Sequence, residues 1–205
     1  MPRRGKGRRY HHGDLRAALI DTAVDLIGER GVRHFSLAEA SRRLGVAVSA
    51  PYAHFSDRDD LLAAVAVRGY QLLAAELAPD PDSDLAPAAR LAAMTAAFIR
   101  FAAAQRPLFE VLYDAGLDKT RYPELAAAQR PVDDAFLTCA TALTGGAGHR
   151  AQDLATALEA TARGHAAFLL DGSFGQGAGV VEQAADRAAQ ATLALIESRH
   201  LLSRA

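Results

Sequence analysis

Apolar residues recur every three to four positions along most of this chain, which is the spacing of one face of an α-helix. The first such stretch covers residues 14–30, and a glycine at position 31 ends it. The same period predicts further helices over residues 58–77, 87–107, 107–113, 124–143, 151–171 and 180–199. Alanine is abundant while Val, Ile and aromatic residues are sparse, so we expect an all-α fold without strands. Pro131 is a point at which the helix over 124–143 can be disturbed.

A shorter apolar stripe lies within residues 35–55. Leu37, Ala40 and Leu44 fall at i, i+3 and i+7, which places them on one face of a helix. Ser36 is a good N-cap, and Glu39 three residues later completes the sequence of a capping box. The pattern therefore predicts a short helix that begins directly after Ser36.

A second short helix is predicted after a tight turn. Gly45 has the place of a left-handed residue that ends the first helix. The next helix would cover about Val48–His54 with Pro51 in its first turn, where the missing N–H costs little. Asp57 and its neighbours then cap the long helix over 58–77. Two short helices joined in this way form a helix-turn-helix, which makes DNA the first partner to consider.

The charge distribution supports a polyanion-binding N-terminal part. The whole chain holds 23 Lys or Arg and 24 Asp or Glu, whereas residues 1–58 hold 11 and 6. The N-terminal segment therefore carries a charge of +5 and the remainder −6. Residues 1–12 contain five basic residues and no acid, as a basic arm would. A local basic surface on an acidic protein favours a specific polyanion site over general stickiness.

Other sequence features exclude several classes. The single Cys139 excludes an intrachain disulfide and fits a reducing compartment. No apolar run reaches the roughly 20 residues of a membrane span. Polar residues between His12 and Asp21 interrupt any signal-peptide core. We therefore expect a cytoplasmic protein without a membrane segment, and the sequence suggests neither a metal site nor a cofactor.

Several motifs in a fixed order resemble the tetracycline-repressor (TetR) family of transcriptional regulators. The resemblance covers about residues 10–75 and rests on Leu15-Arg-Ala-Ala-Leu-Ile-Asp-Thr-Ala23, Gly31-Val32, Phe35-Ser-Leu37, Arg43-Leu-Gly-Val46, Tyr52-Ala-His-Phe55 and Arg58-Asp-Asp-Leu-Leu62. The segment Gly164–Gly172 is similar to the family's C-terminal region, although Arg163-Gly164-His165 replaces a Trp-His-Gly-like triplet. The resemblance implies a homodimer, not an enzyme, whose helical body binds a small molecule and thereby releases the operator.

The resemblance also divides the chain into three parts. Residues 1–12 would be the basic arm, residues 13–57 the three-helix DNA-binding domain, and residues 58–205 the effector-binding and dimerisation domain, with 58–78 as a linking helix. The family's phosphate contacts would fall on Tyr52 and His54, and Arg58 stands where the family often has Lys. Ala53 stands where the family often has Arg. The recognition helix lacks Arg, Lys, Asn and Gln, the side chains that make bidentate hydrogen bonds to a base. The DNA-contacting residues that we expect are Arg8, Arg9, Ser36, Arg42, Arg43, Val48, Ser49, Ala50, Tyr52, Ala53, His54 and Arg58.

The apolar helical body offers an interior for a small, mainly apolar effector. The pocket residues that we expect are Met94, Phe98, Phe101, Phe109, Leu112, Tyr113, Phe136, His165, Phe168 and Leu169, although most such residues fill cores. The last two helices are rich in alanine, and small side chains permit the close approach of a second copy. The dimer contacts that we expect are Leu154, Leu158, Ala162, Ala184, Ala188, Ala191 and Leu195.

Two other functions remain open from the sequence. A sequence-tolerant DNA-packing protein would also carry a basic module, but the acidic body argues against it. A small helical enzyme is less favoured, because Gly175–Gly179 lacks a preceding strand and Cys139 has no histidine nearby in the sequence.

Overall fold

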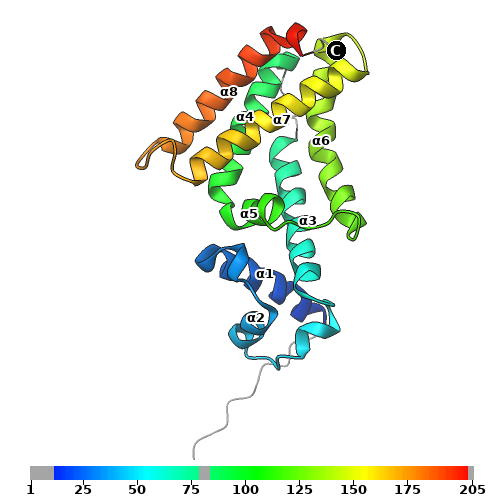
Figure 1. Ribbon diagram of the computed structural model, residues 1–205, viewed down its shortest axis with the longest axis vertical. Helices are drawn as coiled ribbons and strands as arrows, with labels where there is room; N and C mark the ends of the chain where they lie inside the picture. Colours follow the sequence, from blue (N-terminus) through cyan, green and yellow to red (C-terminus); the bar gives the residue numbers. More distant parts are fainter. Residues whose placement is uncertain (1–11, 79–83, 203–205) are drawn as a thin grey trace, which may run out of the picture.

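The computed structural model describes residues 12–78 and 84–202, and all regular structure in this part of the chain is helical. Figure 1 shows a small N-terminal group of helices below a larger bundle. The small group contains α1 (His12–Arg30), η1 (Val32–His34), α2 (Leu37–Leu44), η2 (Ala50–Ala53) and the start of α3 (Arg58–Leu77). The bundle contains α4 (Pro87–Ala104), α5 (Arg106–Asp114), α6 (Pro123–Thr144), α7 (His149–Leu170), α8 (Val180–Glu197) and η3 (Arg199–Leu201). The all-α prediction is confirmed.

Two apolar clusters divide the molecule, and α3 contributes to both. Leu62 and Val65 pack in the first cluster with residues of α1, η1 and α2, while Tyr70 and Leu73 pack in the second with residues of α4, α6 and α7. We call residues 12–66 the head and the described residues after them the body. The first turns of α3, predicted as a linking helix, therefore complete the core of the head.

Helix α5 lies between head and body and contacts both. Its Leu108 and Val111 belong to the head cluster, whereas Phe109 belongs to the body cluster. Two glycines permit its close approach: a Cβ built on Gly28 of α1 would lie 3.1 Å from Pro107, and one on Gly69 of α3 would lie 3.2 Å from Leu112. Both distances are short for a carbon–carbon contact, so α5 packs directly on the backbones of α1 and α3.

Two predicted elements differ from those observed. The helix expected over Val48–His54 is a 3-10 helix of 4 residues, Ala50–Ala53. Its backbone N–H groups at positions 50, 52 and 54 donate to the carbonyls three residues earlier, which is the spacing of a 3-10 helix. Helix α6, in contrast, runs unbroken through Pro131. Pro131 and Ala127 are both exposed, so water can solvate the carbonyl that loses its donor.

Candidate nucleic-acid interface and ligand cavity

The first helix of the predicted motif begins and ends as its sequence indicates. The backbone N–H of Glu39 donates to the Ser36 hydroxyl at 3.2 Å, which caps α2. The Glu39 carboxylate does not complete a capping box, because it pairs with Arg42 at 2.6 Å. Gly45 ends the helix at φ 68° and ψ 28°, a left-handed conformation that glycine adopts without strain.

The segment after this turn presents an exposed, uncharged face. Val48 and Tyr52 are 54% and 58% exposed, which is unusual for large apolar side chains, and Ser49 and Ala53 are also exposed. Ala50 is half-buried, and Pro51 points into the head. The residues predicted to face the DNA groove therefore do lie together on the surface of the head.

The predicted basic contacts have different surroundings. Arg42 is exposed and paired only with Glu39 of its own helix in the described residues. Arg43 makes a two-pronged contact with Glu29 of α1, at 2.6 and 2.7 Å, and this guanidinium lowers the pKa of the Glu29 carboxyl. Arg42 is thus the more available of the two for a phosphate.

Arg58, the first residue of α3, bonds to other segments of the head. Its guanidinium donates to the backbone carbonyls of Val32 at 2.6 Å and Phe35 at 3.1 Å, and it also pairs with Asp59. Both carbonyls flank the entry to α2, so Arg58 fixes the position of that helix. The position expected to contact phosphate is therefore already used inside the head. Ser36 and His54 are half-buried, while Arg8 and Arg9 lie outside the described residues.

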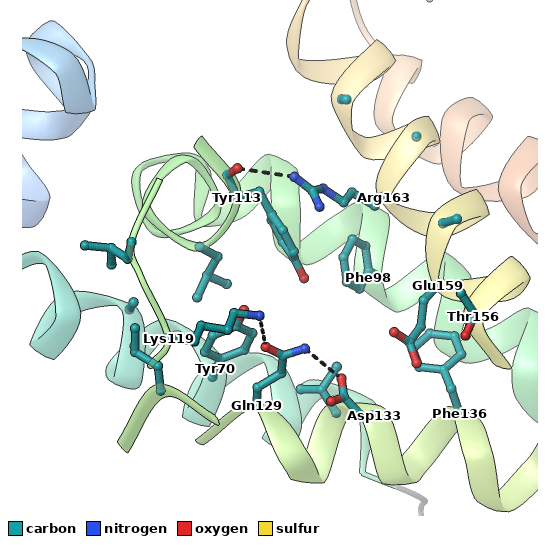
Figure 2. Close-up of a pocket in the computed structure, with 18 of the residues that line it drawn as sticks. Tyr70, Phe98, Tyr113, Lys119, Gln129, Asp133, Phe136, Thr156, Glu159 and Arg163 are labelled. Atoms are coloured by element: carbon teal, nitrogen blue, oxygen red, sulfur yellow. Dashed lines mark hydrogen bonds between the residues drawn. The ribbon is translucent and has the colours of Figure 1, made fainter. Parts of the chain in front are cut away.

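A cavity of about 680 Å³ opens in the body between α3, α4, α5, α6 and α7. Figure 2 shows both aromatic and polar side chains around its wall. Four predicted pocket residues line it: Phe98, Leu112, Tyr113 and Phe136. The cavity is also lined by residues that were not predicted from the sequence. The polar ones among them are Tyr70, Lys119, Gln129, Asp133, Thr156, Glu159 and Arg163.

The other six predicted pocket residues lie outside this cavity. Met94, Phe101, Phe109 and Leu169 are buried in the body cluster. His165 is half-buried, and its Nδ1 lies 2.8 Å from the carbonyl of Thr161. Phe168 is 55% exposed. For the three residues of α7, the helical periodicity explains why they miss the cavity. Residues 159, 160, 163, 164 and 167 face the cavity, so 165, 168 and 169 lie on other sides of the helix.

The polar groups of the cavity form a partly connected chain. Lys119 donates to the side chain of Gln129, whose Nε2 donates to Asp133 at 3.1 Å. Glu159, from the facing α7, has no hydrogen bond or ion pair within residues 12–78 and 84–202. Burial, and then the charge of Asp133, raise the pKa of the Glu159 carboxyl from 4.5 to about 7, while the charge of Lys119 opposes the shift in part. The cavity therefore holds a carboxyl group that no ion pair or hydrogen bond of the described residues stabilises.

Two phenols complete the polar part of the wall. Tyr70 is only 3% exposed, and its hydroxyl has no hydrogen bond among the described residues. Burial raises the pKa of Tyr70 to about 12 and that of Tyr113 further. Arg163 stacks on the Tyr113 ring, with 4.5 Å between guanidinium carbon and ring centre, and donates to the Tyr113 carbonyl. In Figure 2 the Tyr113 hydroxyl points into the open space.

One wall segment of the cavity also contacts the head. Residues 116, 117 and 119 line the cavity, and two residues later Arg121 forms an ion pair with Asp57. Asp57 is the N-cap of α3, and its other oxygen accepts the Asp60 N–H at 2.9 Å. The Arg121 guanidinium lowers the pKa of the Asp57 carboxyl. The loop that lines the cavity is thus joined to the start of α3, which follows the helix-turn-helix.

The residues predicted at a dimer contact are mostly inside the subunit. Leu154, Leu158, Ala162, Ala184 and Ala188 are at most 1% exposed in the single chain, and only Ala191 and Leu195 are half-buried. Their small, apolar side chains pack α7 and α8 onto each other and onto α4. Surface available to a second copy lies instead on the outer sides of these helices, where the exposed Phe168 contacts Phe174 with 6.0 Å between ring centres.

The structure also restricts other kinds of site. Among the described residues, no group of three or more His, Cys, Asp or Glu side chains is arranged to hold a metal ion. None of the described helices combines the length and apolar character that crossing a membrane requires.

Comparison with known proteins gives matches for both parts of the chain. Residues 19–65, nearly the whole head, match the model for bacterial regulatory proteins of the tetR family. No curated protein sequence matches. The fold resembles a protein of unknown function from Rhodococcus sp. RHA1, with 28% identity, a TM-score of 0.74, and coverage of 92% of this chain and 98% of that chain.

Two solved regulators share the whole fold. One is a TetR-like transcriptional regulator from Rhodococcus sp. RHA1, with 21% identity, a TM-score of 0.66, and coverage of 96% of this chain and 100% of that one. The other is the regulator FadR from Bacillus subtilis in complex with stearoyl-CoA, with 15% identity, a TM-score of 0.67, and coverage of 89% and 98%. Residues 19–65 thus match the tetR-family model, and the chain as a whole shares the fold of these solved regulators.

Proposed function

We propose that the chain is a ligand-responsive DNA-binding repressor whose homodimer leaves its operator when a small effector fills the body cavity. The observation that carries this proposal is the segment 116–121, which lines the cavity and pairs with the N-cap of α3 through Arg121 and Asp57. A ligand that displaces this segment acts on the head without touching it. The chain would therefore act by binding, not by catalysis, in the cytoplasm.

The exposed face of the head supports docking on DNA. Val48, Ser49, Tyr52 and Ala53 project together from a part of the head that no other described element covers. The Tyr52 hydroxyl suits a phosphate oxygen, and the small side chains suit van der Waals contact with thymine methyl groups. Direct base reading by such a face is sparse. We therefore assign part of the specificity to DNA shape and to the basic arm with Arg8 and Arg9.

The outer faces of α7 and α8 support a homodimer. Phe168 is the most exposed large apolar side chain of the described body; it contacts Phe174, which in turn contacts His165 and Arg187. Two copies related by a two-fold axis would bury this aromatic group and place the two heads on half-sites about 34–36 Å apart.

The test begins with the DNA itself. Genomic fragments bound by the purified protein are sequenced and footprinted, and affinity for the footprinted duplex is compared with a random duplex at one salt concentration. Tyr52→Ala is expected to weaken operator binding, whereas the matched control Leu72→Ala, an exposed apolar change on α3 away from the proposed face, is not. Equal affinity for random DNA would support a DNA-packing protein instead. If light scattering finds a monomer at micromolar concentration, the proposed homodimer is wrong.

A further inference from the structure

We propose that the effector is an organic cation, with an ammonium group between Glu159 and Asp133 and an apolar body against the aromatic wall. The inference rests on the proposed function, because it takes the body cavity as the effector site. It adds the chemical class of the ligand. Figure 2 shows both carboxylates on the same part of the cavity wall, Glu159 from α7 and Asp133 from α6.

The first argument is that these carboxylates are short of partners. Glu159 has none in the described part of the chain, and Asp133 accepts one hydrogen bond, from Gln129. A half-buried carboxylate without a partner has lost part of its hydration, so a ligand that supplies positive charge there is favoured. The raised pKa of Glu159 has the same physical cause.

The second argument is that the cationic groups of the wall are already engaged. Lys119 is exposed and donates to Gln129. Arg163 lines the cavity, but its guanidinium stacks on the Tyr113 ring and donates to the Tyr113 carbonyl. Neither forms an ion pair with Glu159 or Asp133, although the Lys119 ammonium lowers the pKa of Glu159 in part. The two carboxyl groups therefore keep room for a cation from a ligand.

The third argument comes from the rings. Phe98, Phe136 and Tyr113 present aromatic surface beside the two carboxylates, and an ammonium group near such faces gains cation–π attraction. The unbonded hydroxyls of Tyr70 and Tyr113 offer further acceptors for ammonium protons. A volume of about 680 Å³ accommodates a ligand with one or two aromatic rings.

The test compares three probes of similar size and different charge. Dibenzylamine is the cation, dibenzyl ether the neutral analogue and diphenylacetate the anion, each titrated by calorimetry against the full-length protein. We expect the amine to bind about tenfold more tightly than the ether, since hydrogen bonds to charged groups are the stronger ones. We expect the anion to bind most weakly.

Two variants separate the carboxylate from general effects. Glu159→Gln is expected to remove the preference for the amine and to leave the ether unchanged. Asp153→Asn, a charge-removing change on the exposed side of the same helix, is expected to alter neither. In the wild type, the ratio of amine to ether affinity is expected to grow about tenfold between pH 6 and pH 8 as Glu159 ionises. The charged or titratable groups that share the cavity with Glu159 are Asp133, Lys119, Arg163, Tyr70 and Tyr113.

Each outcome decides between the two proposals. Tightest binding by the ether or the anion, failure of the amine to bind, or an unchanged preference in Glu159→Gln overturns the cationic assignment. Operator binding of the same protein samples is measured in parallel. A protein that prefers the amine but does not bind DNA specifically overturns the proposed function and leaves the cavity assignment standing. Specific DNA binding without a preference for the amine overturns the cationic assignment and leaves the proposed function standing.

Discussion

The half-buried carboxyl of Glu159 makes a prediction about stability that requires no ligand and no DNA. The pKa of this group is about 7 in the folded chain against 4.5 ordinarily. In the unfolded chain the group ionises at its ordinary pKa. The folded state therefore holds a proton that the unfolded state has lost, over the range between these two values. Glu159→Gln removes the ionisation and keeps the shape of the side chain.

The sign of the effect follows from this proton. Below about pH 4.5 the group is neutral in both states and costs nothing. As pH rises toward 7 and beyond, ionisation stabilises the unfolded state first, so the stability of the wild type falls and stays lower above pH 7. The difference between the two pKa values corresponds to about 3 kcal/mol at about 1.4 kcal/mol per pKa unit. Because Glu159 is only half-buried, solvent screening reduces this, and we expect about 1–2 kcal/mol.

Thermal unfolding at two pH values measures this difference. For a chain of this size, 1–2 kcal/mol corresponds to a Tm higher by about 3–6 °C for Glu159→Gln at about pH 8. At about pH 4, below the unfolded pKa, the two proteins are expected to unfold at nearly the same temperature. Asp153→Asn serves as the control, with no gain at either pH. A Tm of Glu159→Gln equal to or below the wild type at the higher pH would refute the reasoning that burial destabilises this carboxylate.

Three further changes test the head and its connection to the body. Ser36→Ala removes the N-cap of α2, and chemical denaturation is expected to show a loss of about 1 kcal/mol. Arg58→Met keeps the side-chain stem but leaves two carbonyls without their donor, so we expect a loss of about 2 kcal/mol and weaker DNA binding, with Arg33→Met as the exposed control. Arg121→Ala breaks the ion pair with Asp57. When operator affinity is measured with and without effector, we expect the effector to weaken binding less in this variant than in the wild type. An equal loss of affinity in both would count against transmission through this ion pair.

The head was largely predictable because its signals are local. Ser36, Gly45 and Asp57 each determine a helix end through their own backbone or side chain, and all three act as the sequence indicated. The roles of Arg43 and Arg58 were not predictable, because their acceptors lie 14 to 26 positions away in the sequence. A basic residue next to a recognition element can contact DNA or hold the element in place, and the sequence does not distinguish these.

The cavity was only partly predictable, because it depends on how helices are rotated relative to one another. Apolar periodicity identified the buried face of each helix, which includes Phe98 and Phe136 but equally Phe101 and Met94. The polar residues of the wall come largely from α3, α6 and α7. How these helices are rotated relative to one another has no signal in the local sequence. Glu159 did carry a signal, since it is the single acid within the apolar and alanine-rich stretch 154–170. The same ambiguity affected α8: a stripe of small residues marks close packing, here within one subunit.

The contacts around α5 indicate how a filled cavity would act on the head. Leu112 and Tyr113 of α5 line the cavity, and the same helix contacts α3 at Gly69 and α1 at Gly28. Close-packed interiors transmit displacement instead of absorbing it, so a ligand that moves Tyr113 moves the helix that supports the head. Inside the head, Arg43 joins α2 to α1 and Arg58 joins the entry of α2 to α3, and neither set of bonds crosses to the body. These bonds join α1, α2 and the start of α3 to one another, so we expect the head to turn as one rigid body rather than to unfold when the effector binds.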